Sequence, residues 1–326
     1  MAKNSFEKIN YSLRPAKAVE RKMISFALQR LIHFSKINLY QYVGFGSTFF
    51  QDHIRFHKDL GIDNLVSIEK SGKKKRFDFN KPFNCIEMLF GKSTDMLPKI
   101  KWDKKTILWL DYDSTLRSEY LSDVQTFFRN AVSGSTFIIS INIDPNSYGD
   151  SNKKRLEAIT EKLGETKIPK GSTNVSFSKK NFNKTICRVI HNEIISTLTK
   201  RNGVLETEDQ LLYKPIFNFR YADGALMLTV GGVIVSNSDI PKYENCAFGD
   251  ISYVKEEFDS FDIEVPSLTR KEISFLNSQL PNGIDINGTY LNKDIAAIDP
   301  LIPSEDVVKY SKIYNYFPVF IESLAI

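Results

Sequence analysis

Cysteine is scarce in this chain and long apolar runs are absent. The 326 residues include three cysteines, Cys85, Cys187 and Cys246, which lie far apart without the spacing of a disulfide pair or a metal site. Such a distribution is typical of a reduced, cytoplasmic compartment. No stretch approaches the roughly 18 apolar residues of a membrane span, and the first residues lack a signal peptide's apolar core. The sequence therefore predicts a cytoplasmic protein that does not enter a membrane.

Two further features exclude other classes of protein. Apolar residues make up 42% and charged residues 25% of the chain, which is typical of a globular protein and excludes a mainly disordered one. The phosphate-binding pattern GxxxxGK[ST] does not occur, so ATP hydrolysis on a P-loop is disfavoured.

Charge is divided unevenly along the chain. Residues 1–200 carry 34 Lys and Arg against 20 Asp and Glu, or +14, whereas residues 201–326 carry 10 against 19, or −9. This division suggests a basic half that binds an anionic partner or nucleic acid through Arg14, Lys17, Arg21 and a cationic loop at residues 73–76. The alternative is ordinary solvation, with the two halves attracting each other, since net charge says little about a specific partner.

Short apolar runs alternate with helical patterns in the first half of the chain. This alternation predicts an α/β fold with a mostly parallel, Rossmann-like sheet. Two β-rich runs joined at Ala222-Asp223-Gly224 predict an antiparallel hairpin that closes the sheet. The expected parallel strands are Leu39–Val43, Leu65–Ile68, Phe83–Leu89, Thr106–Leu110 and Ser135–Ile143. A helix with Pro15 in its first turn is expected before the first strand, and a second from Thr48 to Leu60 after it.

The pattern divides the chain into three parts. Residues 1–35 form a basic helical segment, 36–235 the sheet domain, and 236–326 an acidic, largely helical C-terminal element. Within the sheet domain, residues 147–183 are polar and rich in lysine, which is typical of an insertion or a flap. Thr269 with Glu272, in a Thr-x-x-Glu pattern, predicts the start of one C-terminal helix.

Candidate binding residues come directly after the expected strands. Gly44, Gly46 and Ser47 follow the first strand, where glycine allows a tight turn and close backbone approach to a ligand. Glu69 ends the second strand, 23 residues beyond Gly46, at a distance suited to a carboxylate that binds both hydroxyls of a ribose. The alternative for Glu69 is a surface glutamate at a strand end.

The fourth strand ends in Asp111-Tyr112-Asp113. The glycine turn in YVGFGS, the acid in SIEK, the acidic end of LWLDYD and the closing hairpin together resemble the class I S-adenosylmethionine-dependent methyltransferases. The resemblance covers about residues 36–235.

The resemblance implies a role for each of these residues. Gly44, Gly46 and Ser47 would pass under the methionine part of S-adenosylmethionine, and Glu69 would bind its ribose. Ser93 would lie beside the adenine, although Lys92 stands where the family often has an acid. Asp111 and Asp113 would face the methyl group and the acceptor, and a carboxylate there can act as a general base.

The type of acceptor follows by elimination within the resemblance. No Asn-Pro-Pro-Tyr-like segment follows the fourth strand and no cysteine stands in a Pro-Cys context, which disfavours methylation of base amines and of cytosine rings. Transfer to an oxygen nucleophile is the remaining expectation. The rival hypothesis is a non-catalytic binding or scaffold subunit of a larger assembly with a vestigial cofactor pocket. A nucleotide-dependent dehydrogenase is a further alternative, though the turn lacks a full GxGxxG.

Metal binding is a secondary possibility at two places. His53 and His57 lie one helical turn apart, but Ile54 stands where a zinc protease has glutamate, so packing is the expected role. A Mg²⁺ ion bound by strand-end oxygens, as in some O-methyltransferases, is the second alternative. Its candidate ligands are Asp111, Asp113, Asn142 and Asp144.

Overall fold

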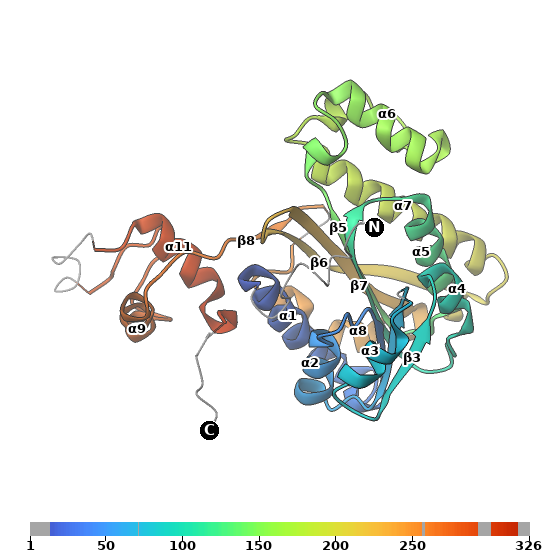
Figure 1. The fold of residues 1–326 in the computed structure, drawn as a ribbon, viewed down its shortest axis with the longest axis horizontal. Coiled ribbons are helices and arrows are strands. Elements are labelled where there is room, and N and C mark those ends of the chain that lie inside the picture. The colour runs from blue at the N-terminus through green and yellow to red at the C-terminus, as the bar shows by residue number, and fades with distance from the viewer. Residues whose placement is uncertain (1–13, 71, 256–257, 293–300, 319–326) are drawn as a thin grey trace.

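The computed structural model describes residues 14–70, 72–255, 258–292 and 301–318 (Figure 1). Its strands are β1 (Gln41–Gly44), β2 (Asn64–Glu69), β3 (Ile86–Phe90), β4 (Thr106–Thr115), β5 (Thr136–Asn142), β6 (Leu211–Ala222), β7 (Leu226–Ser236) and β8 (Phe261–Ile263). Its α-helices are α1 (Pro15–Leu28), α2 (Gln51–Leu60), α3 (Lys74–Asn80), α4 (Ser93–Met96), α5 (Ser118–Asn130), α6 (Asn152–Leu163), α7 (Phe182–Asn202), α8 (Ile240–Asn245), α9 (Arg270–Gln279) and α11 (Ser304–Ile313).

The strands form one eight-stranded sheet in the order β3-β2-β1-β4-β5-β7-β6-β8. Strands β1 to β5 are parallel, β7 runs antiparallel to both β5 and β6, and β8 is parallel to β6. The predicted α/β class, with a mostly parallel sheet closed by an antiparallel hairpin, is therefore confirmed. The strand order reverses beside β1, which places the carboxyl ends of β1 and β4 where open α/β sheets bind ligands.

Alternate residues of the strands face two separate cores. On β4, Ile107 and Trp109 pack on the side of α1, α2 and α3, whereas Leu108 and Leu110 pack on the side of α5 and α7. This alternation follows from the period of two in a β-strand. Helices therefore cover both faces of the sheet (Figure 1).

Several helices differ from their predicted bounds for local reasons. Helix α1 begins at Pro15 as expected but ends at Leu28, where the chain tightens into a 3-10 turn. Helix α2 begins at Gln51, later than predicted, because Ser47 and Phe50 adopt positive φ angles of 49° that interrupt a helix. The cationic run predicted as a loop is helical from Lys74, since α3 buries Phe77 against the sheet.

The polar segment 147–183 is attached to the sheet through α6. Ile159 and Leu163 of this helix are buried. Arg155 is also buried, and its guanidinium donates hydrogen bonds to the carbonyl oxygens of Pro145 and Phe177. These contacts fix α6 beside the carboxyl end of β5.

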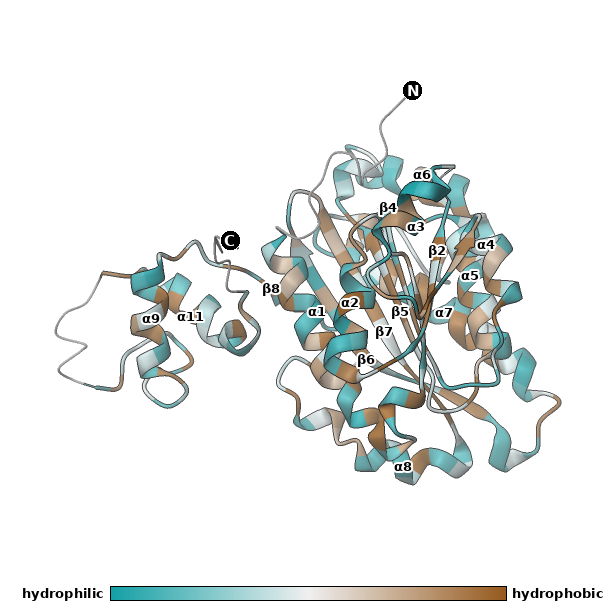
Figure 2. Cartoon of the chain, turned by 60° about the horizontal axis from the view of Figure 1, so that its bottom comes forward, coloured by the Kyte–Doolittle hydropathy of each residue, from teal (hydrophilic) through white to brown (hydrophobic). Residues whose placement is uncertain are grey.

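The chain beyond residue 236 divides in two. Residues 240–255 and 261–263 pack on the main core, and β8 joins the sheet. Helices α9 and α11 form a small separate core around Leu276 and Tyr310, displaced to one side of the sheet (Figure 2). Thr269 and Glu272 make the predicted capping box of α9. Within the described ranges, no helix combines the length and apolar character needed to cross a membrane.

Candidate functional site

The turn after β1 depends on glycine because of its close neighbours. A Cβ at Gly46 would lie 2.6 Å from both the Phe50 ring and Ser67 Oγ, and one at Gly44 would lie 2.2 Å from Tyr42 Oη. Neither space admits a side chain. Gly46 and Ser47 line the adjoining cavity, whereas Gly44 belongs to the packing beneath it. The expected ligand contact of Gly44 is therefore not supported by its position, although its steric role is clear.

Glu69 holds the glycine turn in place. Its Oε1 accepts hydrogen bonds from the backbone N–H groups of Gly46, at 2.8 Å, and Ser47, at 2.7 Å. Both bonds use Oε1, so Oε2 is the oxygen that can accept a bond from a ligand. Burial raises the pKa of Glu69 to about 7, although the two N–H donors oppose the shift. The carboxylate thus lies at the predicted place but also supports the turn.

An acid that the sequence pattern did not reveal supports the end of β3. Ser93 Oγ and Tyr112 Oη both donate to Asp123 Oδ2, and Asp123 is fully buried on α5. Ser93 and Tyr112 line the cavity while Asp123 lies behind them. Asp123 was missed because it stands in a helix far from the strand ends. The amphipathic face of α5 was the only signal, and it favours apolar packing there.

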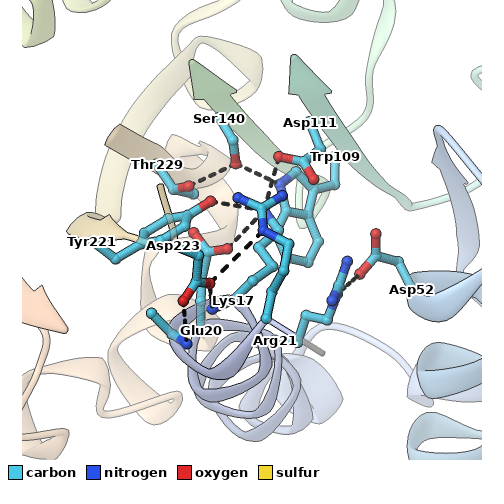
Figure 3. A network of polar contacts seen from close by, with 12 residues as sticks. Lys17, Glu20, Arg21, Asp52, Trp109, Asp111, Ser140, Tyr221, Asp223 and Thr229 are labelled. Atoms are coloured by element: carbon cyan, nitrogen blue, oxygen red, sulfur yellow. Dashed lines mark hydrogen bonds and ion pairs between the residues drawn. The ribbon is translucent and has the colours of Figure 1, made fainter. Parts of the chain in front are cut away.

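Asp111 is held by a lysine from the N-terminal helix (Figure 3). Lys17 Nζ lies 2.8 Å from Asp111 Oδ1 and 2.7 Å from Glu20 Oε2, and it donates to Tyr221 Oη at 3.1 Å. The ammonium also lies 4.5 Å from the centre of the Trp109 ring. Lys17 and Glu20 are completely buried, whereas Asp111 is partly exposed and lines the adjoining cavity.

The charges in this network fix the ionised form of Asp111. Burial alone would raise the pKa of Asp111, but Lys17, Arg21 and Arg14 together lower it below its ordinary value. Burial likewise opposes the charge of Lys17, yet Asp111 and Glu20 raise the pKa of its ammonium. Both groups are therefore charged at neutral pH, and Asp111 is a poor proton acceptor.

Two further contacts anchor α1 over the sheet. Asp223, in the predicted hairpin turn, accepts hydrogen bonds from the backbone N–H groups of Ala16, at 3.1 Å, and Lys17, at 2.9 Å. An acid at a helix N-terminus is stabilised by the helix dipole as well as by these bonds. On the next turn, Arg21 Nε lies 2.6 Å from Asp52 Oδ1 on α2. The helix is thereby tied to both β6 and α2.

The burial of α1 corrects one sequence-based prediction. Lys17 and Arg21 were expected to face an anionic partner, but both are buried in ion pairs with Asp111 and Asp52. Arg14 lies 3.8 Å from Asp223. Lys17 and Arg21 are therefore not available to an anionic partner.

The side chains described above surround a cavity of about 520 Å³ at the carboxyl ends of β1, β2, β3 and β4. It brings together most of the predicted site residues, together with Asp52 and Tyr120, which the sequence did not single out. The predicted residues that line it are Gly46, Ser47, Glu69, Lys92, Ser93, Asp111 and Asp113.

The candidate magnesium ligands do not gather in this cavity. Asn142 and Asp144 are absent from its lining, and Asp144 instead accepts a bond from the N–H of Asn146 in a local turn. Asp111 is occupied by Lys17. Among the described residues, Asp111, Asp113 and Asp144 do not form a group close enough to share one ion. This donor set does not fit Mg²⁺.

The cavity does fit the cofactor that the sequence resemblance implies. A turn with two glycines, a buried carboxylate whose Oε2 takes no part in holding that turn, and a hydroxyl after β3 are the donors and acceptors that a ribose, adenine and amino-acid chain require. The two acids of β4 line the same cavity.

Solved structures of other proteins resemble this fold only weakly. Trm1 from Pyrococcus horikoshii in complex with S-adenosyl-L-methionine has a TM-score of 0.44 and 11% identity, covering 75% of this chain and 61% of that chain. LepI in complex with SAM has a TM-score of 0.32 and 12% identity, covering 60% and 43%. MtNAS in complex with MTA and tNA has a TM-score of 0.28 and 9% identity, covering 37% and 44%. The chain therefore spans less than two thirds of each of these relatives, and we draw no functional conclusion from them.

The sequence itself gives a firmer assignment. No curated protein matches it. It does match, over residues 9–325, the family described as "Putative O-methyltransferase". The match includes α1 and the C-terminal helices as well as the sheet, so it spans nearly all of the 326 residues. The chain belongs to this O-methyltransferase family.

Proposed function

We propose that the protein transfers a methyl group from S-adenosylmethionine to an oxygen nucleophile. The observation that carries this proposal is the single cavity that joins the glycine turn, Glu69 and Ser93 to Asp111 and Asp113. Cofactor-binding groups and candidate catalytic groups thus share one space, in a chain whose family is that of O-methyltransferases.

Each part of the cavity has a distinct task in this reaction. When bound, S-adenosylmethionine supplies the electrophilic methyl group. Glu69 accepts hydrogen bonds from ribose hydroxyls through Oε2, while Oε1 keeps the glycine turn in shape. Asp111, fixed by Lys17, forms a rigid charged wall beside the reacting groups. Holding both reactants in line in this way supplies most of the rate in such a transfer.

Asp113 is the better candidate for the general base. It is exposed and lines the cavity two residues beyond Asp111 on the same strand. Both residues line the same cavity, although the register of β4 against β5 shifts between Asp111 and Thr115. Lys17 forms its ion pair with Asp111 and not with Asp113. Asp113 can therefore take the proton from the hydroxyl group that receives the methyl.

The cofactor part of the proposal predicts a clear effect at Glu69. Replacing Glu69 by Ala should weaken binding of S-adenosylhomocysteine by about 1.5–3 kcal/mol, or roughly 10- to 100-fold, because charge-assisted bonds to the ribose are lost. Calorimetric titration measures this. Glu87→Ala, an exposed acid of β3 outside the cavity, is the matched control and should bind normally. Unchanged affinity in a folded Glu69 variant would remove this residue from the cofactor site.

The pKa of Glu69 adds a pH dependence with a defined sign. Because its folded pKa is raised to about 7, the carboxyl is protonated below that pH and loses its ability to accept two ribose bonds. Affinity should therefore fall as the pH drops below about 7 and level off above it. In the Glu69→Gln variant this dependence should disappear.

The alternative, a non-catalytic scaffold subunit, predicts that the cofactor does not bind. A scaffold subunit with a vestigial pocket should bind neither S-adenosylmethionine nor its product. The supporting contacts of Glu69 and Ser93 favour the enzyme, since a pocket without a ligand has no need of them.

We also propose that α3 is the anionic-partner surface of the basic half. Lys74, Lys75 and Arg76 are exposed on this helix, and Phe79 beside them is 86% exposed and available to stack. Lys70 and Lys92 continue the positive charge to the rim of the cavity. This arrangement would draw a nucleic acid toward the active site.

Binding to a short RNA or DNA duplex should then weaken steeply as the salt concentration rises. In a plot of log affinity against log salt concentration, each phosphate contacted should contribute about −0.9 to the slope. Reversing Lys74, Lys75 and Arg76 to Glu should make this slope shallower, by up to about 3. Reversal of the exposed Lys101 and Lys104, before β4, is the control. Equal binding by both variants would leave the charge of α3 as ordinary solvation.

A further inference from the structure

Three potential metal ligands converge on the edge of the sheet that lies away from the cofactor cavity. One ring nitrogen of His57, a carboxylate oxygen of Asp63 and the sulfur of Cys85 all lie within 4.8 Å of one another. They come from three segments: the last turn of α2, the residue before β2 and the residue before β3. Among the described residues, no other His, Cys, Asp or Glu side chains form such a group.

The backbone explains why these residues meet. Gly61 ends α2 in the left-handed conformation, which turns the chain sharply so that Asp63 returns toward the last helical turn. Strands β2 and β3 pair in register with Leu65 opposite Ile86, so the residues just before these strands are neighbours. Cys85 is thereby brought beside the start of β2.

The histidine is already oriented for ligation. His57 Nδ1 lies 3.1 Å from Asp63 Oδ1, close to the separation of about 3.3 Å between two ligand atoms on a tetrahedral zinc ion. Its ring packs on Phe83 with centroids 4.2 Å apart, which restrains its rotation. Nδ1 also lies 3.1 Å from the carbonyl oxygen of Ile62, a bond that a metal would replace.

We propose that His57, Asp63 and Cys85 bind a divalent metal ion of the zinc type. The set of one imidazole, one carboxylate and one thiolate suits a borderline ion such as Zn²⁺ and excludes Mg²⁺, which prefers oxygen ligands alone. The two anionic ligands balance the charge of the ion. With the sulfur within 4.8 Å of both partners, rotation of the exposed Asp63 and the half-buried Cys85 about the restrained His57 ring brings all three to bonding distance. A water molecule completes four-coordination.

The site is structural rather than catalytic. It lies at the amino ends of β2 and β3, whereas Glu69 and Gly91 lie at their carboxyl ends. The length of these strands separates the two ends by about 17–20 Å. The ion joins the last turn of α2 to the amino ends of β2 and β3. His53, the partner that helical spacing suggests for His57, is fully buried with its Nε2 at the carbonyl oxygen of Val66, and it takes no part.

Titration with Co²⁺ tests the proposal independently of any methyl transfer. Protein treated with a chelator and kept reduced should bind one Co²⁺ per chain and show a near-ultraviolet sulfur-to-cobalt charge-transfer band, which added Zn²⁺ removes. Cys85→Ser should abolish the band, while the buried Cys187 and Cys246 remain in place. Asp63→Asn should weaken binding roughly tenfold or more, since even outer-shell partners of a metal are worth 10- to 100-fold.

His33→Gln, at an exposed histidine outside the site, is the matched control and should leave binding unchanged. Zn²⁺ should also raise the melting temperature of the wild type and of this control but not of Cys85→Ser. Absence of the band in the wild type, or a band that persists in Cys85→Ser, overturns the proposal. Either outcome leaves cofactor binding at Glu69 unaffected, so the two proposals fail separately.

Discussion

Replacing Lys17 by Met should lower the free energy of unfolding by about 3–5 kcal/mol, the usual cost of removing one partner from a buried ion pair. The change leaves Glu20, which is fully buried, and Asp111, which is partly buried, without the cation that both contact. Chemical denaturation at neutral pH measures the loss. Lys58→Met, at an exposed position of α2, is the matched control and should stay within about 0.5 kcal/mol of the wild type.

Two further variants keep this prediction testable if Lys17→Met fails to fold. Tyr221→Phe removes only the hydroxyl that accepts from Lys17 and should cost about 1 kcal/mol. Adding Glu20→Gln to Lys17→Met removes one of the two uncompensated carboxylates and should recover part of the stability. A Lys17→Met protein as stable as the wild type would show that the lysine does not stabilise the fold.

Replacing Asp113 by Asn should reduce kcat by about 10²- to 10⁴-fold, the usual contribution of a general base. Affinity for S-adenosylhomocysteine should remain within about twofold of the wild type, because the cofactor contacts lie at the ends of β1, β2 and β3. Release of S-adenosylhomocysteine from a panel of hydroxyl and carboxyl compounds would first identify an acceptor. The same assay then gives kcat for the variant.

The comparison with Asp111 separates positioning from proton transfer. Asp111→Asn should lower stability, because it leaves Lys17 facing a neutral amide, whereas Asp113→Asn at its exposed position should not. If kcat is unchanged in Asp113→Asn with a hydroxyl acceptor, Asp113 is not the base. An acceptor that is already a carboxylate needs no base, and its transfer rate should be insensitive to this substitution.

Local patterns in the sequence were sufficient to predict seven of the eight strands, but not the short β8 in the part expected to be helical. Period-two runs, turn residues and the hairpin signal at Asp223 each act over a few residues, and the strands formed where those signals lie. The same holds for the capping box of α9, which Thr269 and Glu272 complete between themselves. The site residues that follow strands were predictable because the carboxyl ends of parallel strands all lie at one edge of the sheet, where ligands bind.

The burial of α1 could not be predicted from local patterns. Lys17, Glu20 and Arg21 are strongly polar, so a sequence reading places them at the surface. They are buried because partners distant in sequence, Asp111 and Asp52, compensate their charges. Only a folded chain brings these groups together, and a single sequence holds no signal for such a pairing.

The helical state of α3 escaped prediction for a related reason. Lysine and arginine favour helices well enough, but four adjacent like charges suggested a solvated loop. A single buried aromatic ring, Phe77, packs this short segment against the sheet and stabilises it as a helix. The contact with Phe90, whose ring lies 6.4 Å from that of Phe77, depends on the position of β3.

Calorimetric titration of the wild-type protein with S-adenosylhomocysteine at pH 8 tests the central claim most directly. At this pH most Glu69 side chains carry a charge, because their pKa is about 7. The proposed function predicts saturable heat with one ligand bound per chain, and loss of most of that affinity in Glu69→Ala. Absence of heat from a folded wild-type protein would contradict the account, because the cavity at Gly46, Glu69 and Ser93 would then not be a cofactor site.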